Sequence, residues 1–186
     1  MTRGAAGSES REISVNRAPV LTLWAAVVAE RLGFERDEAL TLGRAVAGLN
    51  AYAKGKALGV FHPRPAAVKR ERERAPGEVL EVALLHRAVP AVRTPEGVRA
   101  LSKGRPITPE SVERYLESKL GAALPAVRAA MTELARALPP AALAERGFTL
   151  YEAFRPEVPA GRRGWGAAGV LDLARLHALA REARDA

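Results

Sequence analysis

The sequence predicts an all-α fold, a bundle or array of about seven helices with one candidate β-hairpin. Apolar residues recur every three or four positions in several segments longer than ten residues, as they do on the buried face of a helix. Proline and glycine cluster between these segments, where they would end helices. We expect residues 1–12 to be a disordered tail and residues 13–186 to form a single helical domain.

Two apolar helices should follow the tail. The first is expected from Arg17 to Leu32, with Asn16 as its N-cap and Gly33 as its stop. The second, from Arg36 to Ala53, is apolar on almost every side, so we expect it to be buried in the monomer or in a homodimer interface.

The middle of the chain is more broken. We expect a loop from Lys54 to Pro65, an exposed charged helix from Ala66 to Ala75 and a further helix from Glu78 to Val89. The short runs Ala91–Arg93 and Val98–Leu101 flank a turn and could pair as the hairpin.

Clearer start signals mark the C-terminal half. Thr108-Pro109-Glu110 combines a cap, a first-turn proline and an acid near the positive end of the helix dipole. The expected helices run from Pro109 to Leu120, from Leu124 to Leu138, from Pro139 to Phe154, and from a cap at Asp172 toward Arg184.

The formal net charge is +8, and one window concentrates it. Lys54 to Arg74 holds seven basic and two acidic residues, a net charge of +5. This excess predicts a weak site for nucleic acid or another anion. The candidate residues are Lys54, Lys56, Lys69, Arg70, Arg72 and Arg74. The alternatives are a basic helix C-terminus and a solvated helix of mixed charge.

The Pro/Gly-rich loop from Arg155 to Gly169 is a second candidate site. Guanidiniums bind carboxylates or phosphates, and aromatic rings stack on planar groups. The candidate ligand-binding residues are Arg155, Arg162, Arg163 and Trp165. Alternatively, Trp165 fills the core and the arginines face helix C-termini.

Nucleotide and DNA motifs fail on inspection. Gly164–Gly169 matches GxGxxG but follows no strand, and the spacing from Gly48 to Lys56 is wrong for a phosphate-binding loop. Val28–Val46 has glycine and alanine at spacings found in helix-turn-helix proteins, but its second helix begins with acids. We expect no catalytic residues, no metal site and no cofactor.

Composition points to a cytoplasmic protein. The N-terminus lacks an apolar signal segment, and the longest apolar stretch, Ala18–Ala29, is shorter than the roughly 20 residues that span a bilayer. The sequence has no Cys or Gln, and Arg outnumbers Lys by 24 to 5, a usage typical of thermophilic or GC-rich bacterial sources.

Three segments resemble a family of uncharacterised bacterial and fungal proteins of about this length. They are the run from Glu12 to Phe34, Ser111 to Lys119, and Phe154 to Pro159 with Arg163-Gly-Trp-Gly166. The resemblance spans most of the chain and implies a helical fold. It implies no activity, and it carries no functional residue to this sequence.

Two functions remain open. The first is a non-enzymatic binding module for an anionic partner such as nucleic acid. The alternative is a protein-interaction module in which apolar helices form a homo-oligomer without any role in nucleic-acid binding. An enzyme is the least supported class, because no acid–base or nucleophilic group has a catalytic context.

Overall fold

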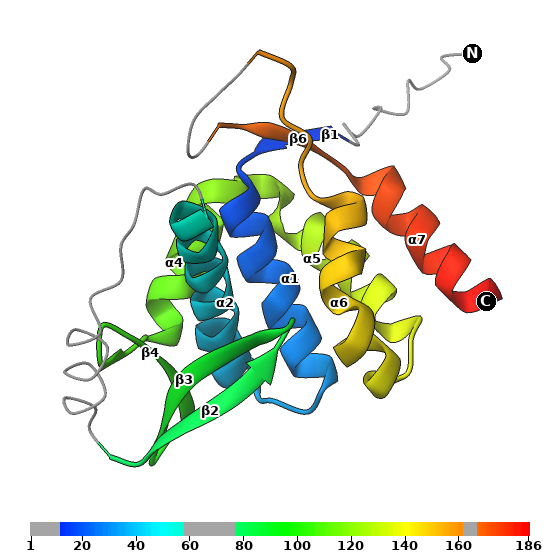
Figure 1. Ribbon diagram of the computed structural model, residues 1–186. Coiled ribbons are helices and arrows are strands. Elements are labelled where there is room, and N and C mark those ends of the chain that lie inside the picture. Colours follow the sequence, from blue (N-terminus) through cyan, green and yellow to red (C-terminus); the bar gives the residue numbers. More distant parts are fainter. Residues whose placement is uncertain (1–11, 58–76, 162–166) are drawn as a thin grey trace, which may run out of the picture.

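Helices and two small sheets make up the described part of the protein (Figure 1). The computed structural model describes residues 12–57, 77–161 and 167–186. Its elements in chain order are β1 (Glu12–Val15), α1 (Arg17–Arg31), α2 (Arg36–Ala57), β2 (Val79–Leu84), β3 (Arg87–Thr94), β4 (Gly97–Ser102), β5 (Arg105–Pro106), α4 (Pro109–Leu120), the 3-10 turn η1 (Gly121–Ala123), α5 (Leu124–Arg136), α6 (Pro140–Phe154), β6 (Gly169–Asp172) and α7 (Leu173–Asp185).

The prediction of an all-α bundle of about seven helices is therefore wrong. One sheet pairs β1 with β6, and the other has the antiparallel order β2-β3-β4-β5. The hairpin foreseen between residues 91 and 101 exists as β3–β4, with Ala91 opposite Ala100. It is part of a four-stranded sheet, because the residues before and after it also form strands.

The main error lies at Glu78–Val89, which forms β2 and the start of β3 in place of a helix. A two-residue turn joins the strands, and both of its residues, Leu85 and His86, have positive φ angles of 49° and 60°. A type I′ turn requires this conformation, and asparagine and glycine usually supply it. Here tertiary contacts hold it: Leu85 is buried, and His86 Nε2 lies 3.0 Å from the carbonyl oxygen of Glu145.

Helix α1 is the centre of the core. Every residue from Pro19 to Ala29 is buried, because α2, α4, α5 and α6 surround it (Figure 1). Trp24 is fully buried and donates its indole N–H to the carbonyl oxygen of Gly147 over 2.9 Å. Its ring also meets Phe154 edge-on, with 5.2 Å between the ring centroids. An apolar helix of this kind is stable only inside such a shell.

Helix α2 is buried within the monomer, as its apolar sequence predicted. It lies between α1 and the four-stranded sheet, in contact with β3 and β4 (Figure 1). The close approach to α1 depends on Gly43, since a Cβ there would overlap the carbonyl oxygen of Thr22 and lie 2.8 Å from the backbone nitrogen of Ala26.

Two side chains of α2 bond to β4 along the part of its outer edge that β5 does not pair with. A carboxylate oxygen of Glu38 accepts the backbone N–H of Val98 at 2.7 Å, and the Thr41 hydroxyl accepts that of Ala100 at 3.1 Å. These N–H groups of β4 would otherwise be buried without partners, which is costly. The helix therefore covers a sheet edge with hydrogen bonds as well as with apolar contacts.

The C-terminal helices begin where the sequence predicted. Asp172 caps α7, since its carboxylate accepts the backbone N–H of Ala174 at 2.9 Å. Asn16 and Thr108 occupy cap positions of α1 and α4, but neither side chain makes a cap hydrogen bond.

Across the described residues, no helix has the length and apolarity needed to cross a membrane.

Candidate functional site

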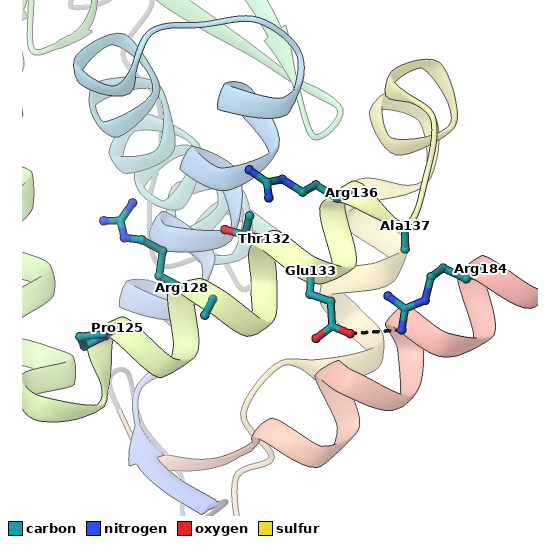
Figure 2. A pocket seen from close by; sticks show the side chains of 8 residues that line it. Pro125, Arg128, Thr132, Glu133, Arg136, Ala137 and Arg184 are labelled. Atoms are coloured by element: carbon teal, nitrogen blue, oxygen red, sulfur yellow. Dashed lines mark hydrogen bonds and ion pairs between the residues drawn. The ribbon is translucent and has the colours of Figure 1, made fainter.

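An open groove of about 670 Å³ runs along the solvent side of α5 (Figure 2). Helix α5 and the residue that follows it supply most of its wall, and one residue of α7 supplies the rest. The lining residues are Pro125, Arg128, Ala129, Thr132, Glu133, Arg136, Ala137 and Arg184. Three guanidiniums and one carboxylate therefore share this surface.

The amphipathic pattern of α5 creates the groove. The buried residues of α5 share one face, so the side chains of the opposite face point outward; the buried residues are Val127, Ala130, Met131, Leu134 and Ala135. A first outward row is Arg128, Thr132 and Arg136, spaced four residues apart. Figure 2 shows these three side chains extending to the same side of the helix. Arg128 and Arg136 are eight residues apart, so their Cα atoms are separated by about 12 Å along the axis.

A second outward row has small side chains. It consists of Pro125, Ala129, Glu133 and Ala137, again four residues apart. Glu133 is the one long side chain in this row, and Figure 2 shows it pointing away from the first row, toward Arg184 of α7. The floor of the groove is therefore low and largely apolar, while charged groups form its two sides.

The guanidinium of Arg128 lies in an unfavourable electrostatic environment. Its side chain is only 22% exposed, and its ion pair with Glu30 is long at 3.8 Å. Burial lowers the pKa of Arg128 and nearby Arg36 lowers it further, while Glu30 and Glu113 act in the opposite direction. Arginine remains protonated at neutral pH despite such a shift. The guanidinium thus carries its charge in a half-buried position, with Glu30 and Glu113 as the nearby carboxylates.

Glu133 is already engaged on the other side of the groove. One of its carboxylate oxygens lies 2.7 Å from His177 Nδ1, and the other lies 3.2 Å from Arg184 Nη2. Because an ionised carboxylate only accepts, the imidazole Nδ1 carries the hydrogen. The hydrogen bond from His177, with a further contribution from Arg184, holds the pKa of Glu133 below its ordinary value.

Arg136 completes the first row and is exposed. No hydrogen bond or ion pair joins its guanidinium to another residue of the described chain. The groove lining carries three positive charges and one negative charge, and that negative charge is shared between two partners. The arrangement can bind an anion by charge-assisted hydrogen bonds.

The residues singled out in the sequence do not line this groove. Lys54 and Lys56 lie in the last turns of α2, with side chains outside the described part. The other candidates of the basic window and of the C-terminal loop also lie outside the described residues. These are Lys69, Arg70, Arg72, Arg74, Arg162, Arg163 and Trp165.

Arg155 is the one candidate whose side chain is described. It follows the last residue of α6 and is half-buried beside Tyr151. Burial raises the pKa of Tyr151 to about 12, although the charges of Arg17 and Arg155 act against the shift. Arg17 donates to the carbonyl oxygen of Pro156 at 2.9 Å, which fixes this segment to the start of α1. Arg155 is not among the residues that line the groove.

Sequence reasoning missed Arg128 and Arg136, although a signal was present. Two arginines and a threonine at four-residue spacing on an amphipathic helix form one outward row. Arg184 could not be found in this way, because only tertiary packing brings α7 beside α5. Among residues 12–57, 77–161 and 167–186, no group of three His, Asp or Glu side chains could hold a metal ion.

Comparison with known proteins adds no assignment. No family model, no curated protein and no solved structure matches the chain. The chemistry of the groove is therefore the basis for a functional proposal.

Proposed function

We propose that this protein is a non-enzymatic binding module for an anionic partner, and that the groove along α5 contributes to binding. The observation that carries the proposal is the row formed by Arg128 and Arg136. Arg128 is half-buried near Arg36 and has only a long ion pair, to Glu30, whereas Arg136 has no partner among the described residues. The net charge of +8 would also favour encounter with an anion.

The test measures binding of labelled polyanions at low salt. Fluorescence anisotropy with polyglutamate and with duplex DNA should give saturable binding at about 50 mM salt, weakening steeply toward about 200 mM. Replacing both arginines, Arg128→Gln with Arg136→Gln, should weaken binding by about tenfold, equivalent to about 1.4 kcal/mol. Glutamine keeps much of the side-chain length and hydrogen bonding, so the change chiefly removes charge.

A matched control separates the groove from the overall charge. Arg114 on α4 and Arg146 on α6 are exposed and make no ion pair with another described residue. The pair Arg114→Gln with Arg146→Gln removes the same charge from elsewhere on the surface. Equal losses in the two double variants would mean that the net charge, and not the groove, binds. Absence of binding at about 50 mM salt with either probe would refute the function itself.

Self-association is the second candidate function, but the apolar surface expected to mediate it is not exposed. The apolar sides of α1 and α2 are covered within the monomer, so they are not available to a second copy. Homo-oligomerisation through another surface stays a prediction, to be tested by sedimentation. The first candidate is preferred because a specific set of side chains supports it.

A further inference from the structure

We infer that the groove along α5 receives an acidic amphipathic helix of a protein partner. This inference rests on the proposed anion binding and narrows it to one class of partner. The groove combines a floor of small side chains with arginines at its sides, and each of these features selects for a helix.

The floor has the dimensions of a helix-packing surface. Pro125 and Ala137 are twelve residues apart, so the groove follows the axis of α5 for about 18 Å, or a little over three helical turns. Ala129 lies between them, and its methyl group leaves space above the backbone of α5. Two helices pack at 8–10 Å between axes, and small residues at the contact permit the shorter distances.

The arginines fix the positions of the partner's acids. Arg128 and Arg136 lie on the same side of the floor, separated by about 12 Å along α5. Carboxylates seven or eight residues apart on a partner helix are separated by about 10–12 Å, so one helix can meet both guanidiniums. Charged side chains that flank an apolar seam pair in this manner in coiled coils.

Nucleic acid fits the same surface less well. No aromatic side chain lines the groove, so bases have nothing to stack on. Phosphates gain nothing from the apolar floor, and the carboxylate of Glu133 on the opposite side would repel a second strand of phosphates. A peptide helix avoids this conflict, because its face toward Glu133 can be uncharged. Glu133 then keeps its bonds to His177 and Arg184.

The experiment compares two designed peptides with identical composition. Each is an alanine-based helix of about 20 residues, long enough to be helical in water. The first carries two glutamates eight residues apart beside an alanine face. The second carries the same two glutamates on opposite faces. Isothermal titration with the full-length protein should show that the first peptide binds about tenfold more tightly, a difference of about 1.4 kcal/mol.

Two variants identify the cause of that preference. Arg136→Gln should remove the advantage of the first peptide, since one of its two carboxylates loses its partner. Ala129→Gln raises the floor at an exposed helical position without removing charge. This variant should bind the first peptide about tenfold more weakly, or weaker still, because close packing is lost. Duplex DNA should bind as before.

The outcomes separate this inference from the function on which it rests. Equal affinity for the two peptides, or an Ala129→Gln variant that binds the helix normally, would overturn the helix as partner. If duplex DNA or polyglutamate still bound in a manner dependent on Arg128 and Arg136, anion binding would stand. Tighter binding of DNA than of the correctly spaced helix would assign the groove to nucleic acid. Loss of all binding would remove both proposals.

Discussion

The close packing of α1 against α2 leads to our first prediction. Replacing glycine by alanine should have opposite effects on stability at two positions of α2. Gly43 and Gly48 both lie in α2. A Cβ at Gly43 would overlap the Thr22 carbonyl oxygen and lie 2.8 Å from the backbone nitrogen of Ala26. A Cβ at Gly48 would meet nothing within 4 Å. The substitutions Gly43→Ala and Gly48→Ala therefore add the same methyl group to a closed and to an open space.

The magnitudes follow from two opposing contributions. Alanine in place of glycine stabilises a helix interior by about 0.5–1 kcal/mol, and Gly48→Ala should gain this amount. Gly43→Ala gains the same contribution but overpacks the core, which costs typically about 1–3 kcal/mol. The cost should reach the upper part of that range, because the atoms in the way are backbone atoms of α1. The expected net loss is about 1–2 kcal/mol.

Urea unfolding gives both free energies, and thermal unfolding gives the Tm shifts, each followed by circular dichroism. In a chain of this size, 1 kcal/mol shifts Tm by about 2–4 °C, so Gly48→Ala should raise Tm by a few degrees and Gly43→Ala should lower it. Two-state behaviour must be checked first by comparing the circular dichroism and Trp fluorescence transitions. A Gly43→Ala protein as stable as the parent, or shifts of the same sign in both variants, would refute the packing of α1 against α2.

Three further predictions concern single polar groups. Thr41→Val should destabilise the protein by about 1–3 kcal/mol, because it leaves the buried N–H of Ala100 without an acceptor, and Thr41→Ser should restore most of the loss in the same urea assay. Trp24→Phe should also cost about 1–3 kcal/mol, since the carbonyl oxygen of Gly147 loses its buried donor; a variant with unchanged Tm would contradict the interior position of the indole. Because the folded-state pKa of Glu133 is lowered, its contribution to stability is present above the ordinary pKa of a glutamate and is lost as the pH falls through the lowered value. The stability difference between the parent and Glu133→Gln should therefore be larger at pH 7 than at pH 3, and an equal difference at both would argue against the bonds to His177 and Arg184.

The residues of the candidate site differ in whether the sequence alone could identify them. The pair Arg128 and Arg136 follows from helical periodicity and could have been found in the sequence. The basic window from Lys54 to Arg74 was predicted as a site because its charges are close together in the chain. Closeness in the chain does not say how the side chains are arranged on the surface. Arg184 and His177 join Glu133 across two helices, so no local pattern reveals them.

Local sequence determined the C-terminal helices and the β3–β4 hairpin of this protein, and tertiary structure decided the rest of its sheets. The first-turn prolines of α4 and α6, the Asp172 cap of α7 and the apolar periodicity act within one or two turns, so they can be read without the rest of the molecule. The turn at Leu85 and His86 lacks any such local cause. Its left-handed backbone is stable because the Leu85 side chain enters the core. This side chain packs so closely on α6 that a Cβ at Gly147 would lie 2.5 Å from Leu85 Cδ2. Residues 79–84 also form a strand because of tertiary contacts. Their hydrogen-bond partners are in β3, and a short apolar run does not by itself specify that pairing.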